Sequence, residues 1–151
     1  MVKNPENMVK ARIAETIVEE MFRTAGYQVY RFGYESVLQN LVQTKNRIYK
    51  KDGVGQVVAS MPDLLVVKER KPDFIEVKYR KDGKLDRKKL KSWAEGRILL
   101  VFPFEPFFKI SKVKDFIETG KMYELDKDRF IPINKKIIDK FIPLIKKYLK
   151  E

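Results

Sequence analysis

The chain contains no cysteine and no histidine. Without cysteine it can form no disulfide, offers no thiol nucleophile and has no cysteine-based zinc site. Without histidine it cannot use a serine–histidine triad or imidazole acid–base catalysis. Any catalysis must therefore depend on Asp, Glu, Lys, Tyr or Ser side chains, or on a hard metal ion such as Mg2+, which prefers oxygen ligands.

Long hydrophobic runs are also missing. No apolar segment approaches the roughly 18 residues of a membrane span, and the first residues, MVKNPENMVKAR, lack the apolar core of a signal peptide. Glycine and proline are scarce, at 7 each in 151 residues, which argues against a disordered chain. We therefore expect a single folded domain over residues 1–151, located in the cytoplasm and without a membrane partner.

Negative charge is in short supply. The chain has 33 Lys and Arg residues against 21 Asp and Glu residues, a formal net charge of +12. Such an excess suits a polyanionic partner, most often nucleic acid. The alternative is the highly charged surface of a protein from a heat-loving organism, but surfaces of that kind usually balance their signs. We expect DNA to be the partner.

Hydrophobic periodicity predicts an α/β fold. Helices are expected over residues 5–25, 35–45, 85–94 and 111–118 and from about residue 134. Strands are expected over residues 27–32, 63–67, 73–79 and 97–104. This order predicts a mixed central sheet flanked by helices, with an α-β-β-β-α-β core. An insertion at about 34–60 follows the first strand, and extra C-terminal helices form an extension at about 107–151.

The segment MPDLLVVKERKPDFIEVKYRK, residues 61–81, carries the most informative pattern. On a strand, Glu76 and Lys78 point to the same face. If the hairpin turns at residues 69–70, Asp63 lies directly across from Glu76, with Cβ atoms about 5 Å apart. Two bare carboxylates at that distance repel each other, and a divalent cation between them would relieve the repulsion. The alternative is a simple Glu76–Lys78 ion pair on a solvated edge strand.

Pro62-Asp63 and Glu76-Val77-Lys78 resemble the two halves of the signature of the PD-(D/E)XK nuclease superfamily. Within that superfamily the chain looks most like the archaeal Holliday-junction resolvases, over residues 9–32 and 59–104. The resemblance implies a restriction-endonuclease-like fold and metal-dependent hydrolysis of DNA phosphodiester bonds. It also implies selectivity for DNA structure, and a homodimer, because junction resolvases act on two symmetric strands.

The resemblance further implies a metal site. Asp63, Glu76 and the main-chain carbonyl of Val77 would hold Mg2+, for which Mn2+ would substitute. Glu15, in the segment AETIVEEMFRTAGYQVYR at residues 14–31, matches the third acidic residue and would bind a second ion or its water shell. Helical periodicity places Glu15 at the border of the apolar stripe and Glu19 further round.

Lys78 would complete the catalytic set. Its ammonium group would orient or help to deprotonate the attacking water and would contact the scissile phosphate. The implied catalytic residues are therefore Glu15, Asp63, Glu76 and Lys78.

Basic residues near this motif are the expected DNA contacts. They would bind phosphates without reading base edges. They are Lys45, Arg47, Lys50, Lys51, Arg80, Lys81, Arg87, Lys88 and Lys91. The alternatives are a solvated helix face after the motif and an insertion that merely extends the sheet.

Three further interpretations stay open. The phenylalanine-rich segment FPFEPFFKI, residues 102–110, fills the core or forms a dimer contact. The chain is a different PD-(D/E)XK nuclease, acting in repair, restriction-like cleavage or viral DNA processing. Alternatively, it is a non-catalytic nucleic-acid-binding protein with an unused metal site.

Overall fold

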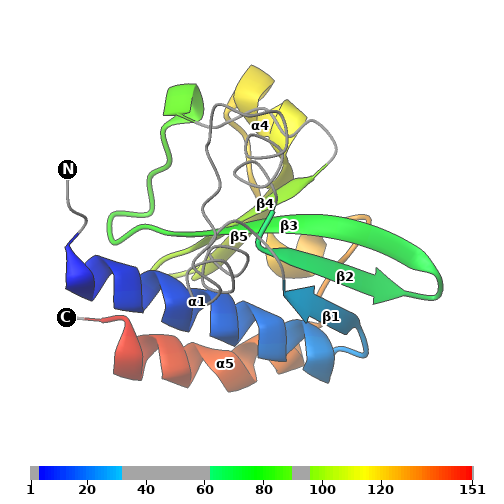
Figure 1. The fold of residues 1–151 in the computed structure, drawn as a ribbon, viewed down its shortest axis with the longest axis horizontal. Helices are drawn as coiled ribbons and strands as arrows, with labels where there is room; N and C mark the ends of the chain where they lie inside the picture. Colours follow the sequence, from blue (N-terminus) through cyan, green and yellow to red (C-terminus); the bar gives the residue numbers. More distant parts are fainter. Residues whose placement is uncertain (1–3, 32–61, 90–95, 151) are drawn as a thin grey trace, which may run out of the picture.

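The computed structural model describes residues 4–31, 62–89 and 96–150 of the chain (Figure 1). It shows an α/β protein with an N-terminal helix and an open, mixed, six-stranded sheet. The helices are α1 (Pro5–Thr24), α4 (Val113–Thr119) and α5 (Lys135–Tyr148), with short 3-10 turns η1 (Arg87–Lys89) and η2 (Leu125–Lys127). The strands are β1 (Gln28–Arg31), β2 (Leu64–Lys68), β3 (Lys71–Tyr79), β4 (Arg97–Val101), β5 (Phe108–Lys112) and β6 (Tyr123–Glu124).

The strands lie in the sheet in their sequence order, β1-β2-β3-β4-β5-β6. Every neighbouring pair is antiparallel except β3 and β4, which run parallel. Parallel strands cannot be joined by a tight turn, so the chain between them has to return along the sheet. The predicted order of one helix, three strands, a crossover and a fourth strand is therefore present, and β5 and β6 extend the sheet beyond it.

Helix α1 forms where the apolar periodicity predicts it. Asn4 caps its first turn, because the side-chain oxygen accepts a hydrogen bond from the N–H of Glu6 at 2.9 Å, and Pro5 suits the first helical position. Met21 and Phe22 lie on its fully buried face. The helix ends before Gly26, whose φ of 94° lies in the region that favours glycine.

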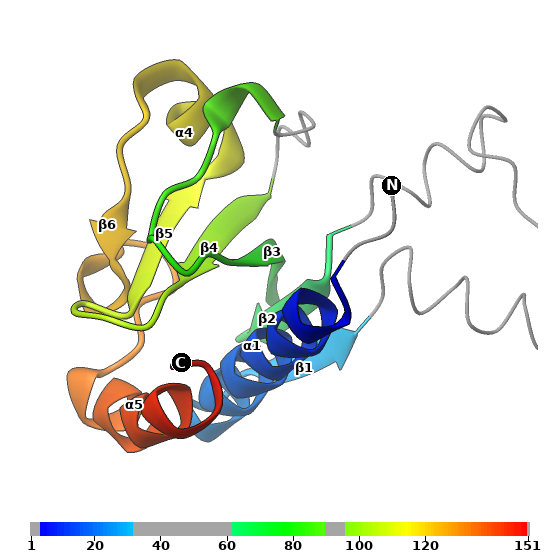
Figure 2. The ribbon, with the colours of Figure 1, turned by 90° about the vertical axis from the view of Figure 1, so that its left-hand side faces the viewer.

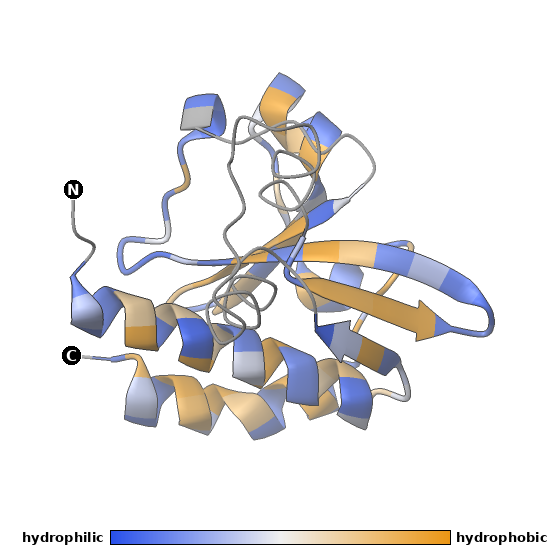
Figure 3. Ribbon diagram, in the orientation of Figure 1, coloured by the Kyte–Doolittle hydropathy of each residue, from blue (hydrophilic) through white to orange (hydrophobic). Residues whose placement is uncertain are grey.

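Helices cover both faces of the sheet (Figures 1 and 2). Helices α1 and α5 lie side by side on one face, over the larger core, which includes Leu64, Ile75 and Val77. The other face carries a smaller cluster around Ile98, with α4 above it. In Figure 3 strand β2 and the middle of β3 are hydrophobic, whereas the turn between them is hydrophilic. No helix in the described part of the chain is long and apolar enough to cross a membrane.

The C-terminal helix is tied to the centre of the sheet. The hydroxyl of Tyr79, at the end of β3, donates to the carbonyl oxygen of Leu149 at 2.8 Å. Leu149 and Ile145 are fully buried in the same core as α1. Helix α5 therefore closes the core under the strand that carries Glu76 and Lys78.

The β2–β3 hairpin has the predicted register. It turns at Glu69 and Arg70, whose φ values of 52° and 67° are those of a two-residue turn that matches the twist of the strands. Leu64 pairs with Ile75. One further step along the same register brings Asp63 opposite Glu76, as the sequence predicted.

Two predictions about the second half of the chain need correction. Residues 85 and 86 are not helical, and the predicted basic helix is represented by η1 alone, since residues 90–95 lie outside the described part. Residues 108–112 form β5, although the sequence predicted no strand there and began a helix at residue 111; the strand predicted over 97–104 ends at Val101. Phe108 and Ile110 are buried in β5, so the core interpretation of the segment is confirmed for these two residues.

The insertion at 34–60 lies outside the described residues. The predicted helix at 35–45 and five of the predicted DNA contacts fall there or in the 90–95 gap: Lys45, Arg47, Lys50, Lys51 and Lys91.

Candidate functional site

Strand β3 brings Glu76 and Lys78 to one face of the sheet. Their ion pair measures 3.4 Å between Nζ and Oε1, and their side chains are 30% and 34% exposed. However, β3 lies between β2 and β4, so the interpretation as a solvated edge strand is wrong. An interior strand gives these two charged side chains a fixed position that an edge strand would not.

Asp63 is fixed at the start of the neighbouring strand. Its Oδ2 accepts a hydrogen bond from the backbone N–H of Val77 at 2.8 Å. In a β-strand the N–H and C=O of one residue point to the same side, so the carbonyl of Val77 is directed toward the same edge as its N–H. The carboxylate of Asp63, the carboxylate of Glu76 and the Val77 carbonyl are therefore near neighbours, as the metal-site prediction requires.

The electrostatics of this acid pair are unusual. Burial raises the pKa of the Glu76 carboxyl to about 7, the negative charge of Asp63 adds to the rise, and the ammonium of Lys78 opposes it. A carboxyl with this pKa carries only part of its charge at neutral pH. A divalent cation bound to both acids would remove the repulsion and favour the ionised form of Glu76. The residues present therefore fit a hard metal ion.

The raised pKa gives a prediction for metal-free protein. Glu76→Gln should increase the free energy of unfolding at about pH 8, because the wild-type folded state must ionise a carboxyl whose pKa is about 7 instead of the ordinary 4.5. The full difference corresponds to about 3 kcal/mol. Since the side chain is 30% exposed, solvent screens part of it, and we expect about 1–2 kcal/mol.

The pH dependence follows from the same shift. Below about pH 4.5 both folded and unfolded states hold the proton, so the variant should have no advantage there; the advantage should grow as the pH rises toward 7. Urea denaturation of wild type and variant in EDTA at about pH 4 and pH 8 measures this. Glu69→Gln, in the exposed turn of the same hairpin, is the control. A stability gain independent of pH would contradict the assignment.

Glu15 is not grouped with the acid pair. Within residues 4–31, 62–89 and 96–150, no set of three or more acidic side chains lies close enough to hold a metal ion. Helix α1 packs on the face that carries Ile75 and Val77, whereas Glu76 and Lys78 point to the opposite face. The structure brings together Asp63, Glu76 and Lys78, and a three-acid set that includes Glu15 is not formed among the described residues.

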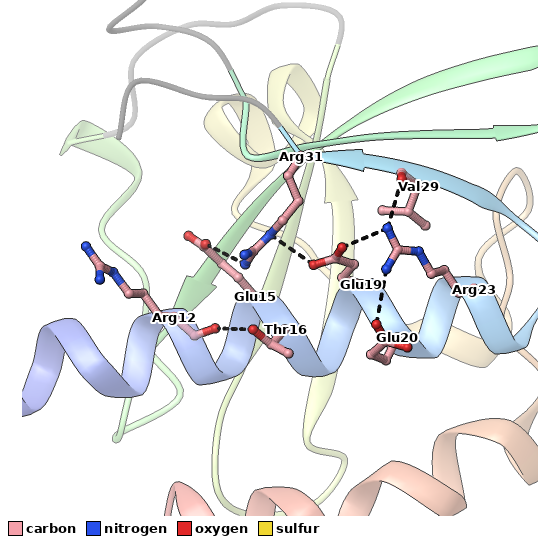
Figure 4. Close-up of polar contacts among 8 residues, drawn as sticks. All are labelled: Arg12, Glu15, Thr16, Glu19, Glu20, Arg23, Val29 and Arg31. Carbon is pink, nitrogen blue, oxygen red and sulfur yellow. Dashed lines mark hydrogen bonds and ion pairs between the residues drawn. The ribbon is translucent and has the colours of Figure 1, made fainter. Parts of the chain in front are cut away.

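Glu15 instead belongs to an ion-pair network between α1 and β1 (Figure 4). Its Oε2 lies 3.4 Å from Nη2 of Arg31, and Nε of Arg31 lies 2.9 Å from Oε2 of Glu19. Glu19 also pairs with Arg23 at 2.9 Å. Arg31 therefore connects the two glutamates and fixes the end of β1 against the helix.

Glu19 is the residue that sequence reasoning misplaced. Its side chain is 9% exposed, less than the 20% of Glu15, although periodicity set it further from the apolar stripe. Burial of a carboxylate requires partners, and the two arginines supply them. The spacing from Glu19 to Arg23 is visible in the sequence as an i,i+4 pair, but the contact from Arg31 arises only when β1 folds back along α1.

The predicted DNA contacts that the structure describes are exposed, and some of them also donate hydrogen bonds to backbone carbonyls. Arg80, Lys81 and Lys88 are exposed. The guanidinium of Arg87 reaches the carbonyl of Glu118 at 3.5 Å, so this side chain extends toward the end of α4. Arg87 is exposed as well, and the guanidinium of Arg80 also donates to a carbonyl, that of Tyr79, at 2.8 Å. All four exposed residues therefore stay candidate phosphate contacts.

Comparison of the chain with protein-family models, curated proteins and solved structures found no match.

Proposed function

We propose that this chain is a metal-dependent DNA endonuclease of the PD-(D/E)XK type, with a restriction-endonuclease-like fold. The observation that carries the proposal is the acid pair Asp63–Glu76 beside Lys78. The pair lies at the start of β2 and on the interior strand β3, and Glu76 has a pKa raised to about 7. The element order supports it, because one helix, three antiparallel strands and a parallel fourth strand accord with the proposed core.

Asp63, Glu76 and the Val77 carbonyl are the residues that would hold Mg2+ or Mn2+. When bound, the ion would supply Lewis-acid stabilisation of the phosphate charge and a water of lowered pKa. The protein itself positions the Asp63 carboxylate and the Lys78 ammonium. The N–H of Val77 holds Asp63 at 2.8 Å, and the Lys78 ammonium remains 3.4 Å from Glu76, where it can orient a water or contact the scissile phosphate.

Glu15 keeps its proposed role as the ligand of a second ion or its water shell. In this structure its carboxylate lies 3.4 Å from Arg31, so that role requires their ion pair to open. This is also the observation that favours the second candidate function, a nucleic-acid-binding protein without catalysis. The described residues contain a pair of acids where the resemblance implies three.

The proposed substrate is DNA selected by structure, as for a Holliday-junction resolvase acting as a homodimer. The charge of +12 supports a polyanionic partner. Other PD-(D/E)XK activities, in repair, restriction-like cleavage or viral DNA processing, share the same chemistry and differ in substrate.

The deciding experiment is a cleavage panel. Labelled four-way junctions, flaps, single strands and plain duplex are incubated with the protein in Mg2+, in Mn2+ and in EDTA. We expect cleavage in both metals, none in EDTA, and the highest rate on a branched substrate. Binding without cleavage of every substrate would support the non-catalytic alternative, and metal-independent cleavage would reject the metal site.

DNA binding should depend on phosphate contacts. Log affinity for duplex should fall linearly with log salt, by about 0.9 for each phosphate neutralised. Replacing Arg80 and Lys88 together with alanine should reduce that slope by about 2, if each meets one phosphate. Replacing Lys136 and Lys140 of α5 is the matched control of equal charge. A larger change in the control would place the duplex on α5 instead.

A further inference from the structure

A cavity lies away from the acid pair, where the strands β4 and β5 meet the loop that follows η2. Its volume is about 450 Å³, within the range of small-ligand sites. It is lined by Arg97, Lys112, Tyr123, Lys127, Arg129 and Phe130, together with Ser111, Asp115 and Asp128. We call it the Phe130 pocket. None of these residues belongs to the proposed catalytic set.

The pocket exposes two aromatic rings. Phe130 is 62% exposed and Tyr123 is 56% exposed, and Phe130 is the most exposed large hydrophobic side chain in the described part of the chain. The position of Phe130 is nonetheless fixed. Oδ2 of Asp128 accepts hydrogen bonds from the N–H groups of Phe130 at 3.1 Å and Ile131 at 2.8 Å, and Ile131 is buried. These bonds fix the backbone that carries the exposed ring.

Two cationic side chains lie close to the Phe130 ring. The guanidinium carbon of Arg97 lies 4.7 Å from the centre of the Phe130 ring, and Nζ of Lys112 lies 4.8 Å from it. Both distances are within the range of cation–π contacts. A ligand that reaches the Phe130 ring would therefore meet both an aromatic face and positively charged side chains.

The basic side chains of the pocket differ in whether they form ion pairs with carboxylates. Arg97 pairs with Asp73 at 2.8 Å, and Lys127 with Glu124 at 2.6 Å. Lys112 and Arg129, in contrast, form no ion pair with a carboxylate among the residues that the structure describes, and both are exposed. These two side chains can therefore meet an anionic group from outside the protein.

We propose that the Phe130 pocket binds a nucleotide of a single-stranded nucleic acid. The base would stack on Phe130 and Tyr123, and the flanking phosphates would contact Lys112 and Arg129. Exposed aromatic rings combined with basic side chains are the means by which proteins bind single strands, with about 1–3 kcal/mol from each stacked base. A duplex hides the faces of its bases, so the pocket selects unpaired nucleotides.

This inference does not require the proposed nuclease chemistry, because it concerns binding alone. The pocket would nevertheless explain a preference of the proposed nuclease for branched or flapped DNA, because such DNA offers unpaired nucleotides beside a duplex. All binding measurements are therefore made in EDTA, where the metal-dependent reaction cannot proceed.

Phe130→Trp gives the direct test. The native Trp93 is first changed to Phe, so that the new indole is the only one in the protein. Stacking of a base on this indole should quench its fluorescence when oligo(dT) of about 12 nucleotides is added, and a duplex of equal length should quench it far less. Phe130→Ala should weaken oligo(dT) binding about 5- to 150-fold, the equivalent of about 1–3 kcal/mol, and change duplex affinity by less than about twofold. Circular dichroism and thermal melting establish that each variant is folded.

The matched control is Tyr148→Ala, which removes a 49% exposed aromatic ring from α5, and it should leave oligo(dT) binding unchanged. Oligo(rU) in parallel shows whether DNA or RNA is preferred, and quenching by either polymer supports the proposal. Absence of quenching, equal loss of duplex affinity in Phe130→Ala, or equally strong competition by poly-glutamate would overturn it. Metal-dependent cleavage of duplex by Phe130→Ala is measured separately, and its result bears on the nuclease proposal alone.

Discussion

For the proposed nuclease, Asp63→Asn and Glu76→Gln should each lower the rate of Mg2+-dependent DNA cleavage by about a thousand-fold, equivalent to about 4 kcal/mol of transition-state stabilisation. Each change removes one of two carboxylates that face each other across β2 and β3. DNA affinity should stay within about threefold of wild type, because the proposal assigns the phosphate contacts to the basic residues around the site.

The measurement is single-turnover cleavage of the best substrate from the panel, with affinity determined separately in EDTA. Glu69→Gln changes an acid of the same hairpin that lies in the exposed turn, and it should cleave at the wild-type rate. Full activity in Glu76→Gln would reject the assignment of the site. Glu15→Gln and Glu19→Gln, compared in the same assay, show whether the carboxylate paired with Arg31 takes part in the chemistry or only supports α1 and β1.

Arg97→Ala is expected to have the largest effect on stability. The side chain of Arg97 is 7% exposed, and its guanidinium lies 2.8 Å from Asp73 and 3.8 Å from Asp128, which is 8% exposed. Removing the cation leaves the partly buried Asp73 without this ion-pair partner and the buried Asp128 with its two backbone hydrogen bonds alone. Loss of one partner of a buried ion pair typically costs about 3–5 kcal/mol. The melting temperature should fall by about 10 °C for a chain of this size.

Thermal and urea denaturation at neutral pH measure the loss. Arg129→Ala removes an arginine from the exposed side of the same pocket, and its stability should remain within about 0.5 kcal/mol of wild type. If both arginine variants lost the same amount, the loss in Arg97→Ala could not be attributed to the buried pairs. The double variant Arg97→Ala with Asp73→Asn should recover part of the stability, because it also removes the negative charge that Arg97 pairs with at 2.8 Å.

The part of the site that could be predicted from the sequence is the part that depends on short-range rules. The two-residue turn at Glu69 and Arg70 sets the register of the hairpin, and strand alternation places Glu76 and Lys78 on one face. Asp63 then follows by simple counting. The helix at residues 5–24 could also be predicted from the sequence, because its cap and its apolar stripe are both local features.

The features that escaped prediction depend on distant contacts. Strand β5 was missed because the prolines at 103 and 106 interrupt the segment around it and hide the alternation of Phe108 and Ile110. The burial of Glu19 depends on Arg31, which reaches it only after β1 has packed on α1. The Phe130 pocket likewise joins a strand end to a loop residue that no sequence period connects with it.

The pairing of α1 with α5 has a consequence for how the protein is made. On a ribosome the chain emerges from its N-terminal end, so α1 and the strand that bears Lys78 are synthesised well before residues 135–148. The hydrogen bond from Tyr79 to Leu149 spans 70 positions of the chain. Until that late segment arrives, part of the apolar surface of α1 is uncovered, and exposed apolar surface of this kind favours aggregation of incomplete chains.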